Sequence, residues 1–182
     1  KFLGIRPRLH PSPSLADPQV AANLGRLVEH GLTLELNVPE YPWQDAAAFA
    51  RAHPTLRLVV NHLAGARLDE GKVTPDWLEA IAAFRSLPNT YCKLSAFYTA
   101  AGTQPAPTDP AFYAGLLDAL VDVFGPDRLF FGSNWPVSDL GGPYGPLPRI
   151  VETYASEHSL EWVDAFFRVN TLKAYGLDGE KR

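Results

Sequence analysis

Residues 128–137 are RLFFGSNWPV, and Ser138 and Asp139 follow them directly. The first part of this stretch is short and apolar, as expected of a buried strand. Polar residues follow directly after this apolar part. A loop rich in proline and glycine follows. In α/β proteins, ligands bind at the carboxyl ends of parallel strands. We therefore expect this stretch to lead from a strand into a functional site.

Four other segments have the same strand-like character, and helical patterns separate them. Alternation of strands and helices is typical of βαβ units with a parallel sheet. Asp17 followed by Pro18 predicts the start of one helix, and Asp109 followed by Pro110 predicts the start of another. The predicted strands are residues 2–6, 32–37, 57–62, 90–95 and 128–134. The predicted helices lie near residues 18–30, 45–52, 75–87, 110–124, 147–157 and 160–175.

Five strands cannot close a (β/α)8 barrel, which typically takes about 250 residues. The alternatives are an open doubly wound sheet and the later part of a barrel. Glu35 and Lys93 favour the barrel, because an open sheet is covered by helices on both faces and rarely tolerates charges within its strands. The predicted fold class is α/β, an incomplete (β/α)8 TIM-like barrel, with residues 1–182 as a single domain. We expect a curved, all-parallel sheet in chain order, with helices on its convex side only.

A period of two sorts the strand residues onto two faces. One face is polar and is expected to line the interior, while the other is expected to pack on helices. The polar set is Arg6, Glu35, Asn37, His62, Lys93, Ser95 and Asn134. The apolar set is Leu3, Ile5, Leu34, Leu36, Val59, Cys92, Leu94 and Phe131.

Composition excludes several classes of protein. The chain is 46% hydrophobic and 20% charged, with a net charge of -4 and no run of lysine or arginine, so nothing indicates a nucleic-acid or anionic membrane surface. No apolar run approaches the roughly 18 residues of a membrane span, and no signal-peptide pattern is present. We expect a cytoplasmic protein. The chain begins at Lys1 and contains no methionine, so its N-terminal part is expected to be missing.

The single cysteine, Cys92, excludes an internal disulfide and a cysteine-based zinc site. Its place on the apolar face predicts a buried small hydrophobe rather than a nucleophile. Among the five histidines, three are expected near helix C-termini, where an imidazolium suits the helix dipole. These are His30, His53 and His158.

His62 is the histidine that ends a predicted strand, so it is a candidate proton donor, acid or metal ligand. His10 lies in the loop HPSPS after the first strand and is ambiguous. Lys93 either forms a buried ion pair with Glu35 or binds a ligand. Arg6 suits a carboxylate clamp, because its guanidinium can bind both oxygens. Trp135 is either a core plug or an apolar wall for a ring.

Five segments, taken in order, match the motifs of one family. Residues 4–6 (GIR) resemble a G-[VI]-R strand, residues 59–62 (VVNH) a [VL]-x-D-H strand, and residues 89–95 (NTYCKLS) an N-V-x-x-K-L-S-G strand. Residues 131–137 (FGSNWPV) resemble F-G-S-D-W-P-V, and residues 170–175 a closing N-A-x-x-x-Y helix. The chain thereby resembles the amidohydrolase-related (amidohydrolase 2) family, which includes fuconolactonase and pyrone-dicarboxylate lactonase.

Such relatives are distorted (β/α)8 barrels that hydrolyse lactones or similar small carboxylates. The resemblance implies a hydrolase of a lactone or related small carboxylated ring, with a small, anionic substrate. It implies catalytic roles for His62 and Asn134. Arg6, Lys93, Trp135 and His10 are the candidate substrate-binding residues. We assign no metal ligand. The resemblance leaves open whether the protein uses one divalent metal such as zinc or no metal, because members of the family differ.

Three departures from the motifs qualify the expected activity. The family's H-x-H strand has no counterpart here, and Asn61 stands where the family has Asp. Asn134 replaces the aspartate that would activate water, and a neutral amide cannot accept a proton near pH 7. The base would then be Asp139 or a residue outside this chain. The alternatives to a lactonase are a metal-dependent decarboxylase of the same superfamily and a truncated, non-catalytic barrel.

Overall fold

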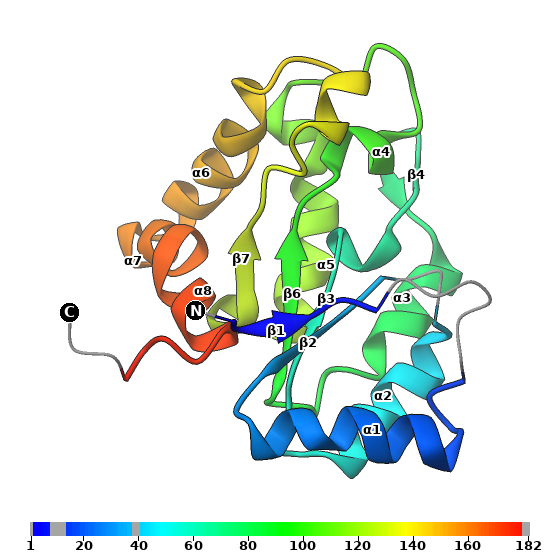
Figure 1. Ribbon diagram of the computed structural model, residues 1–182. Coiled ribbons are helices and arrows are strands. Elements are labelled where there is room, and N and C mark those ends of the chain that lie inside the picture. The colour runs from blue at the N-terminus through cyan, green and yellow to red at the C-terminus, as the bar shows by residue number, and fades with distance from the viewer. Residues whose placement is uncertain (1, 8–13, 38–40, 180–182) are drawn as a thin grey trace.

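A computed structural model describes residues 2–7, 14–37 and 41–179 (Figure 1). Within this part of the chain, five parallel strands form one sheet in the order β1-β2-β3-β6-β7, which is the order of the sequence. The order does not reverse about a switch point, as it would in a doubly wound sheet. The strands are β1 (Gly4–Ile5), β2 (Thr33–Leu36), β3 (Arg57–Val60), β6 (Thr90–Leu94) and β7 (Leu129–Phe131). All five predicted strands are therefore confirmed, each in a shorter form.

Helices connect the strands as predicted. Asp17 caps α1, since its carboxylate accepts hydrogen bonds from the backbone N–H of Gln19 at 2.7 Å and of Val20 at 3.3 Å. Asp109 instead caps a 3-10 turn, Pro110–Tyr113, which continues into α5. The connecting helices are α1 (Pro18–Glu29), α2 (Trp43–Ala52), α3 (Pro75–Ala82) and α5 (Ala114–Phe124).

Several short elements were not predicted. A hairpin of β4 (Leu68–Asp69) and β5 (Lys72–Val73) lies between β3 and α3, and α4 (Phe97–Ala101) follows β6. Single 3-10 turns cover Leu63–Gly65, Pro126–Arg128 and Val137–Leu140. Elements of two to five residues carry too little periodicity to be recognised in a sequence.

The C-terminal region contains α6 (Pro146–His158), α7 (Leu160–Asp164) and α8 (Asn170–Ala174). A π-helical segment, Ala165–Val169, separates α7 from α8, so the helix predicted over residues 160–175 is divided into three. Figure 1 shows these helices beside β7, at the other end of the sheet from α2 and α3.

The two faces of the sheet are buried differently. Leu34, Leu58, Cys92 and Leu94 are fully buried against the connecting helices in the main core. On the opposite face, Val59 and Phe130 form a second cluster with Ala174 at the end of α8. The hydroxyl of Thr33 also donates a hydrogen bond to the Ala174 carbonyl at 2.7 Å. The expectation of helices on the convex side only is therefore wrong for α8, whose C-terminal end buries apolar side chains of the other face.

The face assigned to Val59 was also wrong. The strand register aligns Val59 with Glu35 on one side and Tyr91 on the other, so Val59 shares the face of Glu35. The alternation had been counted from His62, which lies beyond the end of β3 and has a left-handed backbone, with φ of 56°. A period of two does not extend through such a turn.

Polar side chains fix the C-terminal region and the base of β7. Asn170 is fully buried, and its Nδ2 donates to the carbonyls of Pro126 at 2.7 Å and Leu129 at 2.8 Å. The Arg128 guanidinium donates to backbone carbonyls after α3, near the end of α5 and at the start of β6. These carbonyls belong to Phe84, Arg85, Leu87, Thr90 and Val123.

The structure places Cys92 and the three histidines predicted near helix ends as expected. His30 and His53 are the C-caps of α1 and α2, and His158 ends α6 with Nδ1 2.9 Å from the Tyr154 carbonyl. Cys92 is fully buried, and this burial raises the pKa of its thiol. Across the described residues, no helix has both the length and the apolar character needed to cross a membrane.

Candidate functional site

His62 is placed by an unusual turn at the carboxyl end of β3. His62, Leu63 and Ala64 have φ values of 56°, 50° and 55°, all in the left-handed region. This conformation costs roughly 1 kcal/mol or more for each residue that is not glycine, and it concentrates at functional sites. The turn brings the imidazole to the neighbouring strand, where Nδ1 lies 2.9 Å from Oγ of the buried Ser95. Ser95 thus fixes the ring plane of His62.

Glu35, in the middle of β2, accepts hydrogen bonds from three side chains. Its Oε2 accepts from Lys93 Nζ at 3.0 Å and from Asn61 Nδ2 at 3.1 Å, and its Oε1 accepts from the Tyr175 hydroxyl. The side chains of Lys93 and Glu35 are 17% and 16% exposed. The predicted Glu35–Lys93 ion pair is therefore confirmed. We call Glu35, Asn61, Lys93 and Tyr175 the Glu35 cluster.

The ionisation of this cluster follows from its contacts. Burial by itself would raise the pKa of Glu35, but the charge of Lys93 and the three hydrogen bonds outweigh it, so the pKa is lowered. Burial, together with the hydrogen bond to Glu35 and its charge, raises the pKa of Tyr175. Glu35 is therefore an anion, and Tyr175 is a neutral phenol that donates to it.

Asn61 explains one departure from the family motif. Its amide N–H donates to Glu35, and its side chain is fully buried. An aspartate at this position would place a second carboxylate within 3.1 Å of the first, where two anions repel each other. The amide avoids this repulsion and adds a donor.

Asn134 lies three residues beyond β7, in a left-handed turn with φ of 56°. The loop from β7 to Asn134 passes against Lys93, since a Cβ added to Gly132 would lie 3.1 Å from Lys93 Cγ. Trp135, the next residue, is 64% exposed. The core-plug alternative for Trp135 is therefore wrong, because the turn at Asn134 directs the chain outward. Asp139 is exposed in the 3-10 turn that follows.

Arg6 is exposed and directly follows β1. Its charge acts on Tyr175, where it partly opposes the rise in the pKa of that phenol. The register pairs Gly4 with Thr33 and Ile5 with Leu34, so Arg6 follows in line with Glu35. His10 lies outside the described residues. The structure thus brings His62, Lys93 and the Asn134 loop together at the carboxyl ends of β3, β6 and β7, which we call the mouth.

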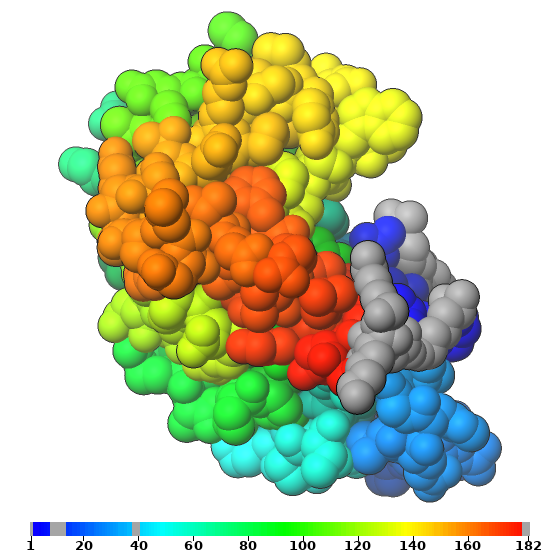
Figure 2. Space-filling view, turned by 90° about the vertical axis from the view of Figure 1, so that its left-hand side faces the viewer, coloured from blue at the N-terminus to red at the C-terminus, as the bar shows by residue number. Residues whose placement is uncertain are grey.

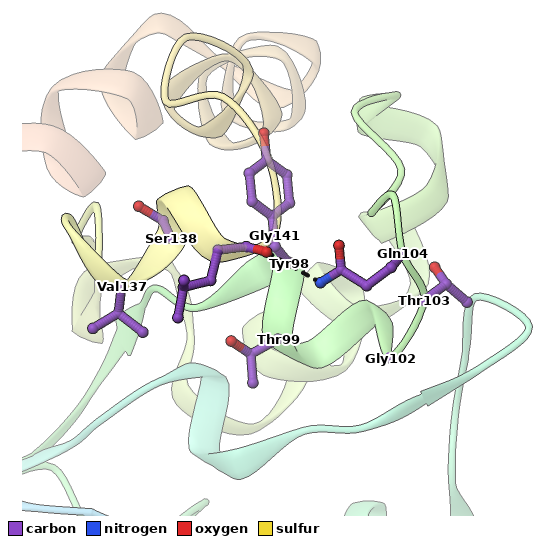
Figure 3. A pocket seen from close by; sticks show the side chains of 9 residues that line it. Tyr98, Thr99, Gly102, Thr103, Gln104, Val137, Ser138 and Gly141 are labelled. Carbon is purple, nitrogen blue, oxygen red and sulfur yellow. Dashed lines mark hydrogen bonds between the residues drawn. The ribbon is translucent and has the colours of Figure 1, made fainter.

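The mouth is open on one side. Figure 2 shows the surface hollowed between the loop that follows β7 and the N-terminal segment. A separate cavity of about 280 Å³ lies between the loops that follow β6 and β7 (Figure 3). Three hydrogen bonds join these loops: from the Tyr98 hydroxyl to the Pro143 carbonyl at 2.7 Å, from Gln104 Nε2 to the Leu140 carbonyl at 3.3 Å, and from the Ala106 N–H to the Gly141 carbonyl at 3.4 Å. Neither His62 nor Lys93 lines this cavity.

The described residues of the mouth do not converge as the ligands of a metal ion would. No three histidine, cysteine, aspartate or glutamate side chains converge within residues 2–7, 14–37 and 41–179. Zinc in proteins takes at least three such ligands. The described residues alone therefore do not fit a zinc ion.

Sequence reasoning did not assign a role to Tyr175 or a contact between Ser95 and His62. Tyr175 is separated from Glu35 by 140 residues, so only the folded chain shows the contact. The signal available was the tyrosine that closes the motif of residues 170–175. For Ser95 the signal was its place on the polar face, next to Lys93 in the alternation.

Comparisons with known proteins agree with this architecture. L-fucono-1,5-lactonase of Burkholderia ambifaria is 34% identical over 148 residues, which are 80% of this chain and 50% of that protein. The crystal structure of an amidohydrolase from Burkholderia multivorans with bound zinc superposes with a TM-score of 0.81 at 27% identity, covering 96% of this chain and 64% of that one. Amidohydrolase 2 from Bifidobacterium longum subsp. infantis gives a TM-score of 0.73 at 26% identity, covering 96% and 61%.

The chain spans about half the length of the curated lactonases it matches. The structural matches confirm that its sheet and helices are part of an amidohydrolase TIM barrel. The family model described as "Amidohydrolase" matches residues 1–177, nearly the whole chain. The chain therefore belongs to the amidohydrolase family.

Proposed function

We propose that this chain forms part of the active site of a lactone hydrolase that acts on a sugar-derived lactone or a related small carboxylated ring. The observation that carries the proposal is the meeting of two ordered pairs at the mouth, His62 with Ser95 and Lys93 with Glu35. The similarity to L-fucono-1,5-lactonase supports the reaction class. The alternative of a decarboxylase has no comparable support.

In this proposal His62 polarises the lactone carbonyl. In this role the ring acts through Nε2, and the contact of Nδ1 with Ser95 at 2.9 Å orients it. Lys93 lies on the neighbouring strand and supplies a positive charge close to the oxygen that becomes negative as water attacks. Such preorganised charge is the largest contribution in many acyl-transfer enzymes.

Asn134 has a different role from the aspartate of the motif. Its amide can orient a water molecule or the ligand, but it cannot take the proton of that water. The base is then Asp139 or a group outside this chain. Arg6 binds the carboxylate of a carboxylated ring, or the carboxylate that ring opening releases from a neutral lactone. Trp135 forms an apolar wall for the ring, and His10 contributes a further polar contact. A small, anionic substrate, a cytoplasmic location and the lack of a nucleic-acid partner are predictions from the sequence.

The proposal is tested with the purified chain and L-fucono-1,5-lactone. Ring opening releases a carboxylic acid, so it can be followed by base consumption at constant pH against the uncatalysed rate in the same buffer. We expect catalysis above that rate, and we expect His62→Ala to reduce it by about 10²-fold or more, as the loss of a positioned acid does.

Asp122→Asn is the matched control, because Asp122 pairs with Arg85 in an exposed ion pair away from the mouth. It should leave the rate unchanged. A chain that binds the lactone without accelerating its hydrolysis would favour the non-catalytic alternative. A chain that neither binds nor hydrolyses it would contradict the proposal.

A further inference from the structure

The Glu35 cluster joins four parts of the fold. Glu35 lies in β2, Asn61 follows β3, Lys93 lies in β6, and Tyr175 follows α8. Three of these side chains donate to the fourth, so both carboxylate oxygens are engaged. A carboxylate with this number of donors cannot rotate freely, and its position is set by the sheet and the C-terminal helix together.

Lys93 is constrained in a way that is unusual for lysine. A lysine ammonium ends a flexible four-carbon chain and normally samples many positions. Here Nζ is 3.0 Å from Glu35, 5.7 Å from the centroid of the Phe130 ring and 5.9 Å from that of Tyr175. Aromatic faces attract cations at such distances. The ammonium thus donates to Glu35 and lies near two aromatic rings, so three neighbouring side chains restrict its position.

Three charged side chains belong to the sheet face that carries the Glu35 cluster. Arg6 and Lys93 are positive and Glu35 is negative, so these three groups sum to one positive charge. One carboxylate on a ligand would neutralise the remaining positive charge.

We propose that Glu35 is a positioning residue that fixes the Lys93 ammonium at the mouth for a monocarboxylate ligand, and that Tyr175 and Asn61 fix Glu35 in turn. The ligand class rests on the proposed function, whereas the positioning of Lys93 does not. Glu35 touches no ligand in this proposal and acts through Lys93.

The positioning is tested without any ligand. In the chain labelled with ¹⁵N, the Nζ ammonium signal of Lys93, assigned with Lys93→Arg, is observable only where proton exchange with water is slow. We expect this signal in the unaltered chain, its loss in Glu35→Gln, and its partial return in Glu35→Asp. Tyr175→Phe should weaken it while Glu35 stays in place. Asp122→Asn, which breaks the exposed pair with Arg85, is the control and should leave it unchanged.

The consequence for binding is tested by calorimetry with L-fuconate as the monocarboxylate probe. We expect Glu35→Gln and Lys93→Met each to weaken binding about tenfold, and the double variant to bind no more weakly than Lys93→Met alone. Circular dichroism confirms that each variant is folded.

Additive losses in the double variant would overturn the proposal, because Glu35 would then act independently of Lys93. A Lys93 signal that persists in Glu35→Gln would overturn it as well. If the unaltered chain does not bind L-fuconate, the proposed function and the ligand class are contradicted, while the ammonium signal still decides whether Glu35 positions Lys93.

Discussion

The Tyr175 hydroxyl offers a clean perturbation of the site. Tyr175→Phe keeps the ring that packs with Phe130, Val59 and Ala174, and it removes only the O–H that donates to Glu35. We expect the variant to fold and to be less stable than the unaltered chain, because the Glu35 carboxylate loses one of its three donors while it remains largely buried.

The size of the effect follows from the structure. A hydrogen bond to a charged group contributes about 1.5–3 kcal/mol. The carboxylate keeps its bonds to Lys93 and Asn61 and is 16% exposed, so water and the remaining donors compensate in part. We therefore expect a loss of about 1.5 kcal/mol in the free energy of unfolding near pH 7, at the lower end of that range.

The loss of stability in Tyr175→Phe should depend on pH in a defined direction. The pKa of Glu35 is lowered in the folded chain, so the stability it contributes is present above its ordinary pKa and is lost as the pH falls through the folded value. The hydroxyl of Tyr175 is one cause of that lowering. The difference in the free energy of unfolding between the unaltered chain and Tyr175→Phe should therefore be fully present above about pH 5 and should shrink at lower pH.

The assay is urea unfolding at several pH values. Tyr91→Phe is the matched control, because Tyr91 also packs on this face and its hydroxyl makes no hydrogen bond with the described residues. It should change the stability by less than about 0.5 kcal/mol, as substitutions that remove no specific interaction do. Equal losses in both variants, or a loss in Tyr175→Phe that does not change with pH, would refute the reasoning.

Three further predictions concern the same site and its support. Asn134→Asp should accelerate lactone hydrolysis by about 10²–10⁴, the contribution of a positioned base, with the gain disappearing at low pH; brisk turnover by the unaltered chain with no gain in the variant would point to Asp139 instead. Arg6→Ala should weaken carboxylate binding by about 1 kcal/mol, since Arg6 is exposed and its pairing is screened, and calorimetry with an acid and its methyl ester should show the loss for the acid only. Asn170→Ala removes two buried hydrogen bonds and should lower the free energy of unfolding by about 2–4 kcal/mol, measured in urea.

Much of the framework could be predicted from local patterns. Apolar runs and capping residues such as Asp17 were sufficient for the strands and connecting helices, because these signals depend on neighbours in the sequence. The Glu35–Lys93 pair was predicted as one alternative, since two charges within apolar strands need a partner. The family was predicted from motifs and is shown by the match over residues 1–177.

Other features could not be predicted from local patterns. The face of Val59 was missed because the left-handed turn at His62 interrupts the alternation from which it was counted. The exposure of Trp135 follows from the turn at Asn134, which no periodicity describes. The division of the last helix by a π segment likewise has no signal in the pattern of apolar residues.

Local patterns were enough to predict which residues carry charge into the sheet and which segments become strands, because apolar runs and the period of two depend on neighbouring residues. The partners of those charges follow from the fold. Tyr175 reaches Glu35 from the end of the chain because α8 covers the face that Val59 and Phe130 leave apolar. Such a contact depends on packing between distant segments, and packing is a property of the folded chain as a whole.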